Sequence, residues 1–431
     1  MSLDKYLPQG ASYEMRVERT KTKSVLFSGN QFESISSADQ VSQTVRLLQD
    51  GKLSIASSSK PNCSEELIKQ AAATVRYGSP HDVPFAEAAS VTPLNLEDPS
   101  TMTNKELIDA MAGLMDDLRS LDDRLSASTQ LNATTREVAL QTSNGFDGSY
   151  RKSVWSYGGS INLTQGDDRL GIYESRAAMG PTLDIKGVKD TIAKKLEYAK
   201  NVVPFKAGAY PVIFTPGEVS FLVNPILASL NGMAVYRQVS PWSDKLGQEM
   251  LDKRITLVDD ASLDNEYTSM PFDLEGTPTR RNVLVENGRL NGLLLNRKVA
   301  ALLGKESTGN ATMAGPGALH VRLNAGTKPL EELIRSIDYG LLIDGTMGAW
   351  AGNPYSGLVS GTISMGLLIE KGQIVGRVKD CMYTINAFEH LHKHLIDFSA
   401  ETDAAGGGGP MGGGTALYPN MMLDEVVIST K

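Results

Sequence analysis

The sequence is short of the residues that most often build cross-links and metal sites. Its 431 residues include two cysteines and five histidines. Cys63 and Cys381 lie far apart, without C-x-x-C or a nearby His, so neither a disulfide framework nor a Cys-rich zinc site is indicated. We expect both to be buried free thiols, which is the usual state of such cysteines.

Long apolar runs and an excess of basic charge are also missing. No run of about 18 apolar residues is present, and the start, MSLDKYLPQG, lacks the basic and apolar segments of a signal peptide. The formal net charge of -8 argues against a large phosphate-binding surface, because such surfaces depend on Lys and Arg. We therefore expect a cytoplasmic protein that binds neither membrane nor nucleic acid.

Common catalytic signatures are absent as well. No Walker or G-x-G-x-x-G sequence stands between a strand and a helix, so nucleotide binding has little support. The segments GNPYSGLVSG and STGN place glycines beside hydroxyls but contain no G-x-S-x-G, so they predict tight turns rather than a serine nucleophile.

What is present describes a globular protein of more than one domain. Apolar residues make up 41% of the chain and charged residues 21%, and one core rarely fills this length. We predict an N-terminal α+β region over 1–100, a helix-plus-strands region over 101–207 and a β-rich domain over 208–431. Ser28-Gly29-Asn30 and Asp50-Gly51 predict hairpins, and Gly158-Gly159 predicts a further turn.

Two helices have marked starts. Thr103 and Glu106 form a capping box ahead of an apolar stripe, and Thr215 and Glu218 form a second one, with Pro216 at the first helical position. The second helix, within 215–232, is almost wholly apolar and is predicted to be buried in the core. Pro225 lies in its interior and predicts a kink or a restart.

The second half of the chain resembles a known family. The segments are PFDLEGTPTRRNVLVENGRLNGLLLNRKVA, STGNATMAG and GLLIDGTMGAWAGNPYSGLVSGTISMGLLIEKGQIVGRVKD. In order and spacing they resemble the C-terminal half of the TldD/PmbA family, once described as modulators of DNA gyrase. The resemblance implies a cytoplasmic metallopeptidase whose subunits pair as an active member, TldD, and a homologous partner without the metal site, PmbA or TldE.

The resemblance also says where zinc would be held. In the active member the helix carries H-E-x-x-x-H, in which the His residues hold zinc and the Glu polarises water, and a Cys near the C-terminus adds a ligand. Alignment on Gly232 puts Val223, Asn224 and Ala228 at these degenerate positions. No His or Cys occurs within 215–232 or in the GGGGPMGGG loop, so the chain resembles the PmbA/TldE side.

A rival metal site must be weighed at FEHLHKH. His390 and His394, four residues apart, form one possible metal edge, assisted by Glu389 or Asp397. The alternative is an ordinary surface helix with its apolar stripe inward, His392 near that stripe, and His390 and His394 turned away.

We expect an α+β fold: an N-terminal α/β region with hairpins and helices, and a C-terminal curved, barrel-like antiparallel sheet with a central buried helix. The expected function is a non-catalytic PmbA/TldE-like subunit, with no cofactor of its own, of a peptidase complex that degrades unfolded or extended peptides. Its partner is then a homologous H-E-x-x-x-H subunit that binds zinc.

The alternative is a stand-alone peptide-binding or scaffold homodimer without hydrolytic activity. In either case Gly315, Gly317, Tyr355 and Ser356 are candidate peptide-binding residues, because glycine admits a neighbouring strand where a side chain would block it. The competing interpretation of these glycines is that they only serve turns.

Overall fold

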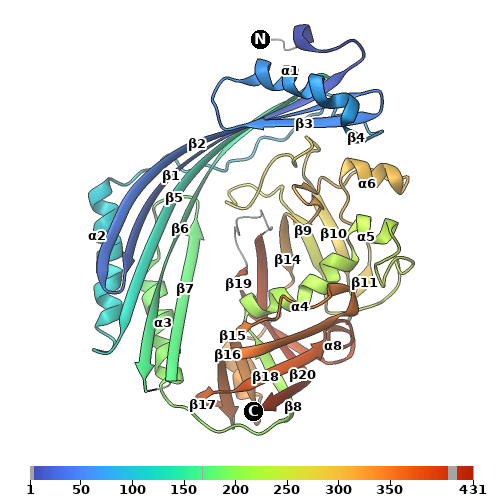
Figure 1. Ribbon diagram of the computed structural model, residues 1–431. Coiled ribbons are helices and arrows are strands. Elements are labelled where there is room, and N and C mark those ends of the chain that lie inside the picture. The colour runs from blue at the N-terminus through green and yellow to red at the C-terminus, as the bar shows by residue number, and fades with distance from the viewer. Residues whose placement is uncertain (1–3, 167, 406–414, 431) are drawn as a thin grey trace. The chain divides into compact units, whose positions relative to one another are not determined.

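The computed structural model describes residues 4–166, 168–405 and 415–430. The chain forms two compact units (Figure 1). The N-terminal unit comprises residues 1–193 and 262–279, and the C-terminal unit comprises 194–261 and 280–431. This partition differs from the predicted division at residues 100 and 207, because regions 1–100 and 101–207 share one sheet. The predicted Gly-rich loop around 406–414 lies outside the described residues.

The N-terminal unit is built on a seven-stranded sheet in the order β4-β3-β2-β1-β5-β6-β7. Figure 1 shows its long strands running side by side. The strands are β1 (Ser12–Ser28), β2 (Gln31–Gln49), β3 (Lys52–Ser58), β4 (Ser79–Pro80), β5 (Ser126–Thr142), β6 (Asp147–Gln165) and β7 (Asp168–Ala178). The helices are α1 (Ser64–Thr74), α2 (Asn104–Arg119) and α3 (Ile185–Ala199), which runs across the boundary between the units.

Turn chemistry explains the first two hairpins of this sheet. Gly29 and Asn30 join β1 to β2, and Asp50 and Gly51 join β2 to β3, with positive φ at all four residues. Both hairpin predictions are therefore confirmed. The turn predicted at Gly158-Gly159 is wrong, because β6 runs straight through it. A Cβ on Gly158 would lie 2.3 Å from the Glu174 carbonyl oxygen of β7, so this glycine serves close strand approach.

Helix α2 covers one face of the sheet. Its capping box is confirmed, since the Thr103 side chain accepts from the Glu106 amide and the Glu106 carboxylate accepts from the Thr103 amide. Five apolar side chains of α2 are buried: Leu107, Met111, Leu114, Met115 and Leu118. The Thr129 hydroxyl of β5 donates to the Met111 carbonyl at 2.9 Å, which fixes the helix on the sheet.

Residues 262–279 pack on the N-terminal sheet although they lie between two strands of the other unit. Phe272 is buried in edge-to-face contact with Phe146 and Tyr150. Under the same segment Lys152 is only 8% exposed, and its ammonium donates to the Ser269 carbonyl at 3.4 Å. Burial, followed by the charge of Arg136, lowers the pKa of Lys152 to about 8.

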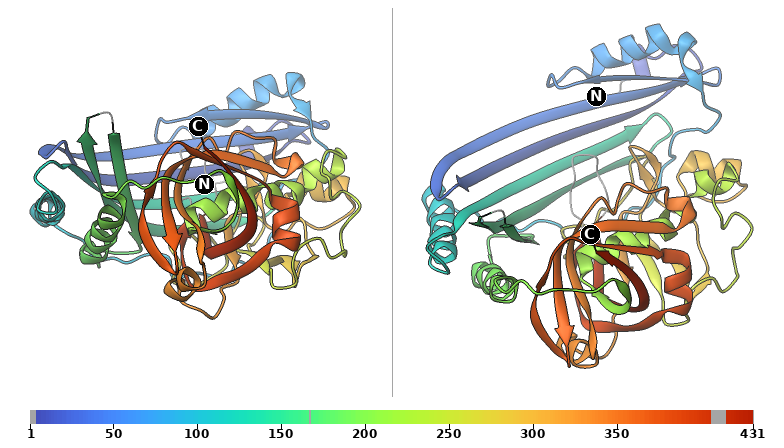
Figure 2. Two further views of the ribbon diagram at one scale, coloured as in Figure 1. Left: turned by 90° about the horizontal axis from the view of Figure 1, so that it is seen from below. Right: turned by 60° about the horizontal axis from the view of Figure 1, so that its bottom comes forward.

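The C-terminal unit has an eleven-stranded sheet in which five strands close a barrel, β8-β15-β16-β18-β20, through a β20–β8 pairing (Figure 2). The strands are β8 (Gly208–Phe214), β9 (Leu257–Asp260), β10 (Arg281–Glu286), β11 (Arg289–Leu290), β14 (His320–Leu323), β15 (Tyr339–Met347), β16 (Leu358–Glu370), β17 (Gln373–Val378), β18 (Cys381–Asn386), β19 (Leu395–Ala405) and β20 (Thr415–Thr430). A separate small hairpin pairs β12 (Ala311–Thr312) with β13 (Gly315–Pro316). The helices are α4 (Pro216–Ser229), α5 (Gly232–Tyr236), α6 (Arg297–Leu302), α7 (Leu330–Arg335) and α8 (Ala387–Lys393).

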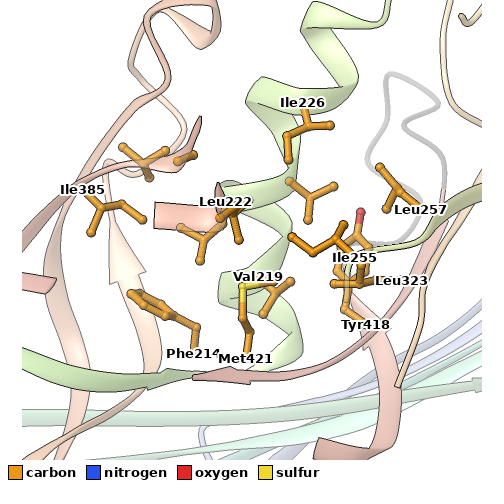
Figure 3. Close-up of a cluster of buried hydrophobic side chains, with 14 of the residues drawn as sticks. Phe214, Val219, Leu222, Ile226, Ile255, Leu257, Leu323, Ile385, Tyr418 and Met421 are labelled. Carbon is orange, nitrogen blue, oxygen red and sulfur yellow. The ribbon is translucent and has the colours of Figure 1, made fainter. Parts of the chain in front are cut away.

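Helix α4 supplies the centre of this unit's core. Figure 3 shows Val219, Leu222 and Ile226 among side chains of the surrounding strands, including Phe214 and Met421, and all five are buried. Burying each such side chain stabilises the fold by about 1.5–3 kcal/mol. The predicted barrel-like sheet with a central buried helix is confirmed, with two parallel pairings, β8–β15 and β14–β20, among the antiparallel ones.

Two smaller predictions can be placed in the same unit. Helix α4 continues as one element through Pro225, which excludes the restart, while the kink stays a prediction. The two cysteines are free and buried, as predicted. Among the helices of the described residues, none has the length and apolar character needed to cross a membrane.

Lys152→Met should stabilise the N-terminal unit at about pH 7 by roughly 2 kcal/mol, because it removes a buried charge while losing one weak hydrogen bond. The folded-state pKa lies below the unfolded value, so the wild-type penalty is complete below about pH 8 and disappears as pH rises toward the unfolded pKa. Urea denaturation at about pH 7 and near pH 10.5, followed by tryptophan fluorescence, measures this. The exposed Lys105→Met is the control, and a destabilised Lys152→Met at pH 7 would contradict the argument.

Candidate functional site

The three positions that the resemblance assigns to the metal motif lie on α4 but do not share a surface. Val223 is buried in the core at 2% exposure, Asn224 is exposed, and Ala228 is half-buried. None of these side chains is a good zinc ligand. In the described part of the chain, no group of three or more His, Cys, Asp or Glu side chains is arranged to hold a metal ion.

The polar residue that the structure brings into this region is Glu218. The predicted capping box is wrong: within the described residues the Thr215 side chain makes no capping bond, and the Thr215 amide donates to the Ile343 carbonyl at 3.1 Å. The Glu218 carboxylate accepts a hydrogen bond from the Thr346 hydroxyl of β15 at 2.7 Å. Pairing of β8 beside β15 therefore occupies the amide that the capping box needed.

Glu218 belongs to a set of four residues, with Asp344, Thr346 and Tyr383, that we name the Glu218 cluster. Tyr383 is fully buried, and its hydroxyl has no hydrogen-bond partner among the described residues, although Glu218 and Thr346 are close enough to affect its pKa. Asp344 is paired with Lys195 at 2.9 Å. The cluster places a carboxyl, a phenol and a hydroxyl together at the start of α4.

Burial determines the charge of this cluster. Glu218 is 5% exposed, and desolvation raises its pKa to about 7, against the smaller opposing effect of the Thr346 hydrogen bond. Burial likewise raises the pKa of Tyr383. The carboxyl is therefore close to half-protonated at neutral pH, which is the range in which a carboxyl can exchange a proton.

A second buried polar set, which we name the Asp259 network, consists of Asp259, Asn310, His320, Arg322 and Thr415. The Asp259 carboxylate accepts from the Leu319 amide at 2.8 Å, the His320 amide at 2.7 Å and the Asn310 side chain at 2.5 Å. Burial nevertheless raises the pKa of Asp259. This carboxylate therefore ties the end of β9 to β14 and to the 305–310 loop.

Asn310 is completely buried and uses its whole side chain. Its amide group donates to Asp259 and to the Gly317 carbonyl, and its oxygen accepts from Asn282 at 3.1 Å and Thr308 at 2.7 Å. Two donors and two acceptor positions are the full capacity of an Asn side chain. Asn310 therefore fixes the STGN segment in place.

His320 is held in its neutral form. Its Nε2 accepts from the Arg322 Nε at 3.0 Å, so the proton lies on Nδ1, which donates to the Thr415 hydroxyl at 3.0 Å. Burial, then the adjacent Arg322 charge, lowers its pKa to about 4. Thr415 begins β20, so the ring links the two parallel strands β14 and β20 at their first paired residues.

Sequence reasoning missed both sets. Glu218 was assigned to a cap, and Asp259 and His320 lie in short strands without a motif. The signal that was available is the STGN segment, which carries Asn310, but it was interpreted only as a turn.

The rival histidine site is arranged differently from the prediction. Helix α8 ends at Lys393 with His394 as its C-cap, and β19 begins at Leu395. His390 is buried, with ring nitrogens 2.9 Å from the Asn386 carbonyl and 3.4 Å from the Glu425 carbonyl, whereas His392 is exposed. The predicted orientation of His390 and His392 is therefore wrong. The His390 and His394 rings are 5.1 Å apart, and whether they bind a metal stays a prediction.

The four candidate peptide-binding residues lie in two turns. Gly315, with φ of +114°, and Gly317 belong to the β12–β13 hairpin, where Gly317 donates to the Asn310 carbonyl. Tyr355 and Ser356 lie in a 3-10 turn capped by Asn353, ahead of β16. These positions serve local turns, and a role in peptide binding stays a prediction.

Glu218→Gln should remove a pH dependence of stability. The folded-state pKa lies above the unfolded value, so wild-type stability falls as pH rises from about 4.5 through 7. At about pH 8 the variant should be more stable than wild type by roughly 2–3 kcal/mol, with little difference near pH 4. Denaturant unfolding at both pH values decides this, with the exposed Glu389→Gln as control. Equal stabilities at pH 8 would show that the carboxylate is solvated.

His320→Gln should change the acid side of the same curve. The folded-state pKa of His320 is depressed, so wild type loses stability as pH falls from about 6.5 through 4, by up to roughly 3 kcal/mol. The Gln variant lacks this titration and should give a flatter curve between these pH values, whatever its stability at neutral pH. His392→Gln, at an exposed site, should keep the wild-type slope. A variant slope as steep as wild type would exclude the neutral buried imidazole.

Comparisons with known proteins agree with this architecture. The profile described as "PmbA/TldA metallopeptidase C-terminal domain" matches residues 207–430, more than half of the chain, and "PmbA/TldA metallopeptidase domain 1" matches residues 13–75. An uncharacterized protein of Methanocaldococcus jannaschii is 26% identical over 88% of this chain and 90% of its own length. The metalloprotease PmbA homolog of Haemophilus influenzae is 26% identical over 79% of each chain.

A solved structure extends the match to the whole fold. The crystal structure of TldE from Thermococcus kodakarensis superposes with a TM-score of 0.90 at 25% identity, covering 99% of this chain and 98% of that one. With matching profiles in both units and a full-length structural match, the chain belongs to the PmbA/TldD metallopeptidase family.

Proposed function

We propose that this chain is the non-catalytic, PmbA/TldE-like subunit of a cytoplasmic metallopeptidase complex in which a homologous TldD-like subunit binds the zinc. The observation that carries the proposal is the composition of α4. The resemblance puts Val223, Asn224 and Ala228 at the motif positions, and residues 215–232 contain neither His nor Cys. A zinc site needs several N, S or O ligands that converge on one point.

Glu218 does not replace the missing ligands. It is the one carboxylate of α4, it is 5% exposed, and it already accepts the Thr346 hydroxyl. A buried carboxyl with a pKa near 7 is poorly suited to hold a hydrated cation. The position of Glu218 supports a structural role, in which its carboxyl packs the start of α4 against β15 and exchanges a proton near neutral pH.

The contribution of such a subunit is to hold substrate. Zinc in the partner would polarise the attacking water, and this chain would form an opposing wall for an extended or unfolded peptide. Gly315, Gly317, Tyr355 and Ser356 remain our candidates for the peptide contact, because the two glycines admit a neighbouring strand where a side chain would block it. Recognition through backbone groups suits substrates of varied sequence.

The test is affinity purification of the tagged chain from its native cell. We expect a homologue with H-E-x-x-x-H to co-purify, the complex to contain zinc and cleave unfolded peptides, and the chain alone to have neither stoichiometric zinc nor peptidase activity. Metal analysis and a peptide-cleavage assay on both samples measure this. Gly317→Val and Ser356→Trp, assayed in the reconstituted complex, test the peptide contact separately.

Two outcomes would contradict the proposal. Stoichiometric zinc in the chain alone, lost with activity in a His390→Ala, His394→Ala double variant, would identify the α8 histidines as a catalytic site. Recovery of the chain only as a homodimer, without a homologue or peptidase activity, would favour the alternative, a stand-alone peptide-binding protein.

A further inference from the structure

The N-terminal unit has a groove that the proposed function does not use. Its volume is about 390 Å³, within the usual range for small-ligand sites of roughly 300–1,000 Å³. Its floor is one face of four adjacent strands, β2, β1, β5 and β6, and its wall is the 97–102 connection with the first turn of α2. Every lining residue belongs to this one unit.

One end of the groove is apolar. The Trp155 indole of β6 is 6% exposed, and the apolar side chains of Met102 and Leu107 also line the groove. Ala133 of β5 lies beside Trp155 in the register, and its small side chain leaves space above the sheet at that point. An apolar group placed there contacts the indole and displaces water from it.

The other end is cationic. Lys21 and Lys23 of β1 line it, and neither ammonium forms an ion pair or hydrogen bond with any of the described residues. The acidic lining residues are already engaged. Asp39 accepts two hydrogen bonds from Arg19, at 2.8 and 2.6 Å, and Glu97 is paired with Arg151 at 3.0 Å.

The acidic residue Asp98 is occupied in the wall itself. Its carboxylate accepts from the Ser100 amide at 2.9 Å, and its own amide donates to the Ser153 hydroxyl. Asp39 also lies opposite Lys21 in the β1–β2 register and is near enough for the Lys21 charge to help lower its pKa, whereas Lys23 faces Ser37 and Ala133. Lys23, with Lys21 beside it, is therefore the cation left to answer a ligand's charge, and an anion is the matching charge.

Register relates the two ends. Trp155 pairs with Ala133, and Ala133 pairs with Lys23, so indole and ammonium stem from one cross-strand row, two strand spacings apart. Two spacings are about 10 Å, and a lysine side chain can reach back over Ala133. The apolar side chain of a ligand that packs on Trp155 and the carboxylate that pairs with the lysines can therefore belong to one amino-acid residue or to two adjacent ones.

We propose that this groove binds the C-terminal carboxylate of an extended peptide whose last side chain is apolar. The choice of a peptide rests on the proposed function, while the charge and shape of the groove do not depend on it. The site discriminates ends of peptides: the carboxylate pairs with Lys21 and Lys23, the apolar side chain packs on Trp155, and the backbone lies along the floor.

The experiment is isothermal titration of the full chain alone with acetyl-Ala-Ala-Phe, its C-terminal amide, and phenylpropionate, so it needs no partner subunit or peptidase activity. We expect the acid to bind at least about tenfold more tightly than the amide, with weaker binding at high salt. A variant with Trp242→Phe and Trp350→Phe, which leaves Trp155 as the one indole of the chain, should report the same binding through Trp155 fluorescence.

Lys21→Met with Lys23→Met should reduce affinity for the acid to that of the amide and leave the amide unchanged. The matched control, Lys69→Met with Lys186→Met, removes two exposed lysines of the same unit outside the groove and should bind as wild type. Equal binding of acid and amide, wild-type binding by the groove variant, or no binding would overturn the site. Phenylpropionate binding as tightly as the peptide would overturn the peptide assignment. These titrations use the chain alone, so each outcome can be interpreted even if no partner subunit is found.

Discussion

The burial of α4 inside the closed C-terminal barrel is the constraint on which that unit depends. Val219, Leu222 and Ile226 fill the space that the five strands enclose, and a helix in that position leaves little room for an unpaired polar group. The one carboxylate on α4 consequently takes a hydroxyl from β15 and holds its proton to near-neutral pH. The chemistry of Glu218 follows from packing, because the same helix that closes the core brings the carboxyl out of water.

Strand β20 imposes the second constraint. It pairs with β8, which closes the barrel, with β18 and β19, and in parallel with β14. Parallel pairing at the start of β20 brings Thr415 to His320, while Asp259 fixes the amides at the start of β14. The Asp259 network thus sets the register of a long strand at the point where it enters the sheet, and a one-residue slip there would reverse which side chains face the core.

Local signals in the sequence predicted local structure well and the site poorly. Asp50-Gly51 needs only its own backbone to turn, and the Thr103–Glu106 box forms because nothing else competes for the Thr103 amide. The same pattern at Thr215 failed, since β15, more than 100 residues later, takes the amide and offers Glu218 another partner. The orientation of His390 was wrong for a related reason: its ring lies near the Glu425 carbonyl of β20, a contact with a distant strand that helical periodicity does not show. Fold class was predictable from a long family resemblance, whereas the buried polar sets arise from pairings between distant strands.

The position of Val223 connects this packing to the proposed loss of chemistry. Its side chain is 2% exposed among apolar neighbours, so an imidazole there without a metal would be a buried polar group lacking a partner, at a cost of about 1–3 kcal/mol. In a subunit that holds zinc, metal coordination offsets that cost. In one that does not, valine at this position stabilises the core. Asn224 and Ala228 are more exposed, so a polar side chain at either position carries no comparable desolvation penalty. Of the three positions that the resemblance assigns to the motif, Val223 is therefore the one at which an apolar side chain stabilises the fold.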